Sequence, residues 1–80
     1  MTADTPQRRR RIEQLVKNLL PGCTAAFMPG TDGGLAFRIR SKNGRFRTGI
    51  IKLLSHHQKV RLNRHWLQRQ ISVHEGPKSP

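Results

Sequence analysis

The sequence contains few acidic residues, few aromatic residues and a single cysteine. Only four of its 80 residues are Asp or Glu, whereas 16 are Lys or Arg, so the formal net charge is +12. The lone Cys23 excludes an internal disulfide and is compatible with a reducing compartment, so we expect a cytoplasmic protein. No run approaches the roughly 20 apolar residues that cross a bilayer. These absences leave one small domain that is held together by packing.

The scarcity of acids also argues against enzyme chemistry. The four carboxylates fall in separate parts of the chain: Asp4, Glu13, Asp32 and Glu75. No paired carboxylates are therefore indicated, and Cys23 has no recognisable base partner. The four histidines include no pair at the i, i+3 or i, i+4 spacing that brings two imidazoles to one metal: His56, His57, His65 and His74. We expect no catalytic residue, no metal site and no cofactor.

Two segments have the apolar periodicity of amphipathic helices. The first is predicted over residues 6–20, because Thr5-Pro6 reads as an N-cap followed by proline at the first helical position. Its apolar stripe consists of Ile12, Leu15, Val16, Leu19 and Leu20. The second helix is predicted over residues 55–74, opened by the capping-box pattern Ser55-x-x-Gln58. Its apolar side consists of Val60, Leu62, Trp66, Leu67, Ile71 and Val73. Residues 1–5 and 75–80 are predicted to be disordered tails.

The middle of the chain predicts three strands. Residues 23–28 are a strand candidate, and residues 29–34 form a glycine-containing turn. Asn43-Gly44 between two strand-like runs indicates a hairpin with a two-residue type I′ loop. The pairing that follows from this loop is Lys42 with Arg45, Ser41 with Phe46, Arg40 with Arg47, Ile39 with Thr48, Arg38 with Gly49 and Phe37 with Ile50.

Side-chain alternation in this register separates the hairpin into an apolar face and a basic face. The apolar face consists of Leu35, Phe37, Ile39, Phe46, Thr48 and Ile50. The basic face consists of Arg38, Arg40, Lys42, Arg45 and Arg47. Like charges directly opposite each other destabilise a strand pair by roughly 0.2–1 kcal/mol. We therefore expect something outside the hairpin, of opposite charge, to contact the basic face.

The order of elements predicts an α+β fold over residues 6–74, with the sequence α-β-β-β-α. A three-stranded antiparallel meander with one apolar face places both helices on that face. The basic face of the hairpin then becomes the outside of the domain.

Short stretches of the chain carry a resemblance to known families. The first helix ends in Leu20-Pro21, a glycine-rich turn follows, and Leu54-Ser55 opens the last helix. In these features the chain resembles families of short bacterial proteins of unknown function with the same order of elements, which implies the fold and no activity. In element order it is also similar to the double-stranded-RNA-binding domain. It departs from that domain at residues 54–59, where the domain has a glycine-containing, lysine-rich segment, so no binding residues are transferred from it.

The charge pattern indicates an anionic partner, because a field of one sign attracts and holds a polyanion. The basic face lacks Phe, Tyr and Trp, which favours contact with duplex phosphates over stacking on unpaired bases. We expect a nucleic-acid-binding accessory protein of low sequence specificity, for DNA or RNA, and not an enzyme. The expected contact residues are Arg38, Arg40, Lys42, Arg45 and Arg47 of the basic face, with Arg8, Arg9, Arg10 and Arg11 of the first helix. The alternative is an adaptor or inhibitor that docks the same face on an acidic partner protein.

Overall fold

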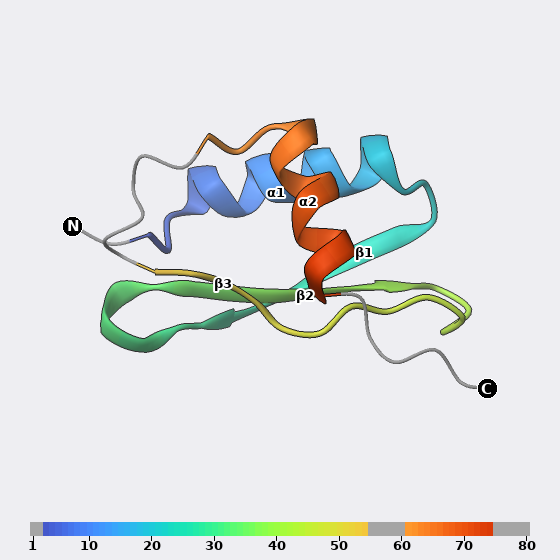
Figure 1. Ribbon diagram of the computed structural model, residues 1–80. Helices are drawn as coiled ribbons and strands as arrows, with labels where there is room; N and C mark the ends of the chain where they lie inside the picture. Colours follow the sequence, from blue (N-terminus) through green and yellow to red (C-terminus); the bar gives the residue numbers. More distant parts are fainter. Residues whose placement is uncertain (1–2, 55–60, 75–80) are drawn as a thin grey trace.

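The computed structural model describes residues 3–54 and 61–74 and shows two helices on one face of a three-stranded sheet (Figure 1). The elements in chain order are α1 (Pro6–Leu19), β1 (Cys23–Pro29), the 3-10 turn η1 (Thr31–Gly33), β2 (Leu35–Ser41), β3 (Ile51–Leu53) and α2 (Arg64–His74). The sheet is antiparallel, with strand order β1-β2-β3. The predicted α-β-β-β-α order and the predicted placement of both helices on one face are confirmed.

Helix α1 begins as its capping residue predicts. The Oγ1 atom of Thr5 accepts a hydrogen bond of 3.1 Å from the Arg8 N–H, and Pro6 is the first helical residue. The helix ends at Leu19, one residue earlier than predicted, and Leu20 is its C-cap. Its buried residues are Ile12, Leu15 and Val16, which form the predicted stripe against the sheet.

Residues 3–5, predicted to belong to a disordered tail, are ordered. Ala3 is buried, and its N–H donates a 2.8 Å hydrogen bond to the carbonyl of Gly33 in η1. Asp4 forms an ion pair with Arg9. These contacts arise because the start of α1 lies beside η1, a proximity of distant segments that composition alone does not reveal.

Helix α2 begins at Arg64, later than predicted. The side-chain oxygen of Asn63 accepts a 2.8 Å hydrogen bond from the Trp66 N–H, so Asn63 is the N-cap, and residues 61–63 are not helical. The Ser55-x-x-Gln58 pattern lies outside the described residues. Leu67 is fully buried, as expected for the apolar side. Val73 was predicted to share that side and is 75% exposed in the last turn, so this prediction is wrong.

The core lies between the sheet and the two helices. Its buried members are Ala3, Ile12, Leu15, Val16, Cys23, Leu35, Phe37, Ile39, Ile51, Leu53 and Leu67. Phe37 is central, because its ring lies 5.8 Å from that of Phe27 in β1 and 6.3 Å from that of Trp66 in α2. Strand β1 and helix α2 therefore both contact the core through one phenylalanine in the middle strand.

The turn between β2 and the following segment differs from the predicted type I′ loop. Gly44 has a positive φ of 74°, but Asn43 does not, and a type I′ turn needs both. The Gly44 N–H donates to the Ser41 carbonyl, and the Asn43 side-chain oxygen accepts from the Arg45 N–H. The predicted Lys42–Arg45 pair is absent, because local side-chain hydrogen bonds stabilise a wider loop. Ser41 still lies opposite Phe46, because the Ser41 N–H donates a 2.9 Å hydrogen bond to the Phe46 carbonyl.

The predicted register is correct at Arg40–Arg47 and wrong beyond Thr48. Phe37 pairs with Ile51 and not with Ile50, so the later strand contains one extra residue relative to β2, a β-bulge. Without the bulge, Lys52 would lie opposite Leu35 on the buried face, whereas the observed register buries Ile51 and Leu53 instead. The bulge is stabilised by Thr48, whose buried hydroxyl accepts the Ile39 N–H at 3.0 Å.

Candidate functional site

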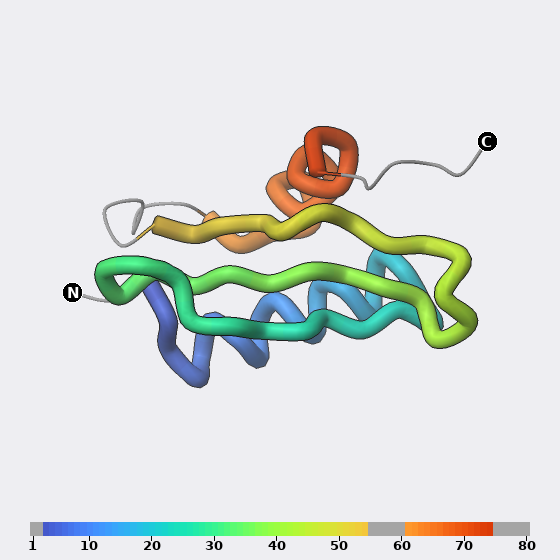
Figure 2. The backbone as a smooth tube through the Cα atoms, turned by 90° about the horizontal axis from the view of Figure 1, so that it is seen from below, coloured from blue at the N-terminus to red at the C-terminus, as the bar shows by residue number. Residues whose placement is uncertain are grey.

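The face of the sheet opposite the helices, here called the outer sheet face, is open to solvent. Figure 2, which views the molecule from below, shows the strands in front of α1. Alternation assigns residues to this face from all three strands: Thr24, Ala26 and Met28 of β1, Ala36, Arg38 and Arg40 of β2, and Arg47, Ile50 and Lys52 of the last strand and its approach. No described helix covers it.

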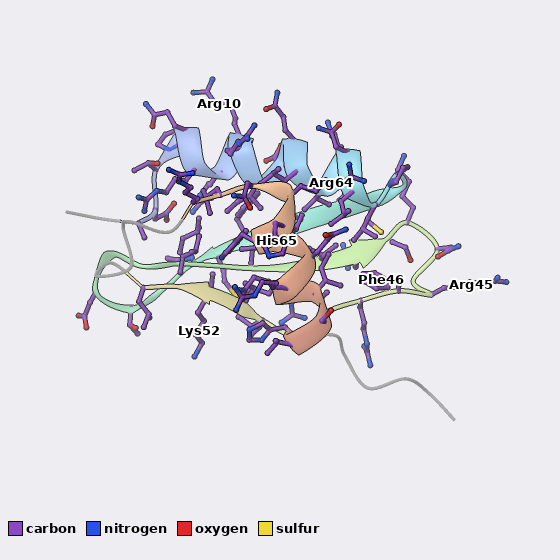
Figure 3. All side chains as sticks on the ribbon, turned by 45° about the horizontal axis from the view of Figure 1, so that its top comes forward. Arg10, Arg45, Phe46, Lys52, Arg64 and His65 are labelled. Atoms are coloured by element: carbon purple, nitrogen blue, oxygen red, sulfur yellow. The ribbon has the colours of Figure 1, made fainter. Side chains whose placement is uncertain are left out.

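Six exposed cations lie on this face or in its adjoining turn. Arg38, Arg40 and Arg47 share the face, as predicted, and all three are exposed. Lys42 and Arg45 lie in the turn, where Arg45 points outward at the far end of the sheet (Figure 3). The shifted register adds Lys52, which the sequence analysis did not include and which points away from the helices (Figure 3). Cationic side chains therefore extend along the whole length of the sheet.

Arg40 and Arg47 lie directly opposite each other. The flanking hydrogen bonds run from the Ser41 N–H to the Phe46 carbonyl and from the Thr48 N–H to the Ile39 carbonyl. This pattern makes Arg40 and Arg47 a non-hydrogen-bonded pair, in which Cα atoms approach to about 4.5 Å and side chains are closest. Two guanidinium groups therefore project side by side from the outer sheet face, where they can contact neighbouring anionic groups of one ligand.

No carboxylate neutralises these cations among the residues that the structure describes. Asp4, Glu13 and Asp32 lie before α1, on α1 and in η1, respectively. The one ion pair found among the described residues joins Arg9 to Asp4, on the helix side. The outer sheet face therefore keeps its positive field.

The N-terminal arginines have different surroundings from those of the sheet. Arg9 donates to both carboxylate oxygens of Asp4, at 2.7 and 2.8 Å, and its guanidinium lies 5.5 Å from the centre of the Phe27 ring. These hydrogen bonds lower the pKa of Asp4 and raise the pKa of Arg9. Arg11 donates to the Leu62 carbonyl at 3.2 Å, which ties α1 to the segment before α2. Arg9 and Arg11 thus hold parts of the fold together.

The structure does not bring the two predicted groups of contact residues together. Arg10 points away from the sheet on the helix side, whereas Lys52 points in the opposite direction (Figure 3). A rigid partner lying on the outer sheet face would contact the sheet cations without reaching Arg10. The predicted placement of both helices on the apolar face already implied this separation, although both groups were expected to contact the partner.

An apolar region of the outer sheet face was missed from the sequence. Ile50, predicted to be in the core, is 40% exposed because the bulge turns it outward. Together with Met28 and Ala36 it lines an open hollow of about 260 Å³ near η1, with Lys52 also in the lining. The adjacent isoleucines Ile50 and Ile51 were the available signal, since two consecutive apolar residues leave the register of a strand ambiguous.

Other chemistry has little support in the described part of the chain. No group of three or more His, Cys, Asp or Glu residues there could hold a metal ion. Cys23 is buried, and burial raises the pKa of its thiol. None of the described helices has the length and apolar character to cross a membrane. Comparisons with protein-family models, curated proteins and solved structures gave no significant match.

Proposed function

We propose that this protein binds duplex nucleic acid through the outer sheet face, with little sequence preference. The observation that carries the proposal is the set of exposed cations on a face without a described acid or a covering helix: Arg38, Arg40, Arg47 and Lys52, with Lys42 and Arg45 in the turn. Such a surface attracts phosphates and gains affinity by releasing counterions from the duplex.

The composition of the face favours the backbone of a duplex over unpaired bases. Its residues include no Phe, Tyr or Trp, because Phe27 and Trp66 both contact Phe37 on the core side, and Phe46 packs against the same core. Stacking on unpaired bases needs such rings. Phosphate contacts carry no sequence information, so binding of DNA and RNA duplexes without base preference follows.

The N-terminal arginines do not form part of the proposed interface. Because Arg10 projects from the helix side, it contributes to long-range attraction and not to the interface itself. Arg9 and Arg11 act mainly through their contacts with Asp4 and Leu62.

The test is the salt dependence of duplex binding. Log K falls by about 0.9 per phosphate neutralised for each tenfold rise in salt, so Arg40→Ala with Arg47→Ala should reduce the slope by about 1.8. Arg64→Ala with Arg69→Ala is the matched control, because both arginines are exposed on α2 and the net charge falls equally. Equal effects of the two double variants, or no duplex binding near 0.1 M salt, would contradict the proposal.

The hollow beside Lys52 favours a second candidate function, docking on an acidic partner protein. A phosphate backbone gains nothing from Ile50 and Met28, whereas an apolar side chain flanked by carboxylates could occupy the hollow. Ile50→Ser distinguishes the two candidates, because Ile50 is exposed and its replacement leaves the core intact. This variant should bind duplexes as the parent does under the first proposal. If instead a single acidic protein is retained from a nuclease-treated lysate and Ile50→Ser releases it, the second candidate is correct.

A further inference from the structure

The two edges of the sheet differ in how well they are protected from pairing with another strand. At the β3 edge, the Gly49 N–H donates to the His74 carbonyl at the end of α2, so a helix terminus occupies part of that edge. At the other edge, β1 has seven residues, Cys23–Pro29, and none is charged. Exposed edge strands usually carry charges that prevent pairing with other strands. In a chain of net charge +12, an uncharged edge indicates a surface where another strand is accepted.

The hydrogen-bonding groups at the β1 edge follow from the pairing with β2. The Lys42 N–H donates to the Gly22 carbonyl and the Gly30 N–H to the Gly34 carbonyl, which extends the β1–β2 ladder at both ends. Even-numbered residues of β1 therefore direct their backbone groups toward β2 and odd-numbered residues direct theirs outward. The backbone groups of Ala25 and Phe27 point outward and have no partner within the described residues.

The two ends of this free edge offer no unpaired N–H group. Cys23 already donates its N–H to the Leu20 carbonyl at 3.0 Å. Pro29 has no N–H to donate. The unpaired N–H groups of this edge are thus limited to those of Ala25 and Phe27, whose C=O groups also point outward.

We propose that β1 pairs with β1 of a second copy of this chain, in an antiparallel register centred on Ala26. In this register Ala25 of each copy pairs with Phe27 of the other. All four N–H groups and all four C=O groups of Ala25 and Phe27 in the two copies are then satisfied by four hydrogen bonds. The set is complementary to itself, so a second copy satisfies it with the same two residues about a two-fold axis.

The side chains agree with this register. On the outer sheet face Ala26 faces its own mate in a close, non-hydrogen-bonded pair, where a small residue fits. On the helix side, Phe27 of one copy lies beside Ala25 of the other, next to a hollow of about 280 Å³ lined by Glu13, Lys17, Cys23, Thr24 and Ala25. Phe27 is half-buried in the single chain, so the second copy would cover its exposed part.

The sheet cations of the two copies lie far apart in this arrangement. The nearest sheet cation to the two-fold axis is Arg38, opposite Ala26 in β2. Three strand spacings, about 14 Å, separate it from its mate. The Debye length is about 8 Å at 0.15 M salt, so this repulsion is largely screened. On the helix side, however, the Arg9 guanidinium lies 5.5 Å from the centre of the Phe27 ring, and Lys17 lines the hollow beside Ala25, so cations of α1 lie close to the joining strand. Because salt screens their repulsion, association should strengthen with added salt, opposite to the behaviour of duplex binding.

Sedimentation of the nuclease-treated protein measures self-association in the absence of nucleic acid, so it tests this proposal separately from the proposed function. We expect the mass to rise from one chain to two with concentration, more readily at higher salt. Ala26→Lys should abolish the dimer, because two ammonium groups would face each other across the axis with Arg38 of each copy beside them. Thr24→Lys, its control, makes the same charge change opposite an arginine of β2 but faces Met28 of the other copy and should leave the dimer intact. A protein that remains monomeric throughout, or equal loss in both variants, would overturn the proposal.

Cross-linking tests the register itself. In a Cys23→Ser background, Ala26→Cys places two thiols on residues whose Cα atoms lie about 4.5 Å apart, within the range for a disulfide. Oxidation with diamide should give a covalent dimer. Thr24→Cys is the control, because its Cα lies about 14 Å from that of its mate in this register. Preferential cross-linking of the Thr24→Cys variant, or none with Ala26→Cys, would show that the register is wrong.

Discussion

The opposed pair Arg40–Arg47 predicts that one substitution stabilises the fold while it weakens binding. The pair lies where side chains are closest, and no described acid neutralises it. Two unit charges about 5 Å apart repel by about 0.8 kcal/mol in water. Directly opposed like charges cost about 0.2–1 kcal/mol in measured strand pairs. Arg47→Gln keeps much of the side-chain length and removes the charge, so it should raise the free energy of unfolding by that amount at low salt.

Urea denaturation at two salt concentrations provides the assay. At 1 M salt the Debye length is about 3 Å, so the gain in the free energy of unfolding should disappear. Arg38→Gln is the control, because Arg38 lies opposite the uncharged Ala26 and its replacement should leave stability unchanged. In duplex binding, by contrast, Arg47→Gln should reduce the salt slope by about 0.9.

Two results would refute this reasoning. If Arg47→Gln leaves the free energy of unfolding unchanged or lower at low salt, the guanidinium groups do not repel each other appreciably. If the gain persists at 1 M salt, its origin is not electrostatic. Either result would remove the argument that the outer sheet face keeps an unfavourable charge pair for the sake of a ligand.

Four further predictions concern the fold. Thr48→Val should lower the free energy of unfolding by about 1–3 kcal/mol, because the buried Ile39 N–H loses its acceptor, whereas Thr48→Ser should cost less. Phe37→Ala should lower it by about 3–5 kcal/mol and leave little folded protein by circular dichroism. Asp4→Asn should lower Tm at pH 7; since the folded-state pKa of Asp4 is depressed, this ion-pair stabilisation is lost as the pH falls through that value, so the two proteins converge in acid. The buried Cys23 thiol, with its raised pKa, should react with Ellman's reagent more slowly than free cysteine until the protein is unfolded.

Local signals in the sequence were sufficient to predict the element types and their arrangement. Thr5-Pro6 and the apolar spacing of α1 defined that helix to within one residue. The start of α2 was not predicted, because the capping signal of Asn63 was not weighed against the stronger-looking Ser55-x-x-Gln58 pattern. Asn63 and the Ser55 pattern are both local capping signals, so the sequence alone does not rank them; Leu67 and Trp66, which follow Asn63, pack in or against the core.

The candidate site was predicted in part. Arg38, Arg40 and Arg47 follow from alternation near the turn, where register is set locally. Ile50 was assigned to the wrong face and Lys52 to neither face, because the bulge that sets their positions depends on the core: Ile51 and Leu53 face inward together with Phe37. Such a non-local requirement cannot be read from the turn. The separation of Arg10 from the sheet cations, by contrast, follows from the predicted placement of both helices on the apolar face.

The contact between Trp66 and Phe37 gives the protein a built-in optical probe. Trp66 is the single tryptophan of the chain and lies on the helix side of the sheet, whereas the cations lie on the opposite side. Its emission should therefore change when the core opens and stay constant when the outer sheet face is occupied. Unfolding and ligand binding can thus be followed independently in one sample, with the intrinsic fluorescence for the first and a labelled duplex for the second.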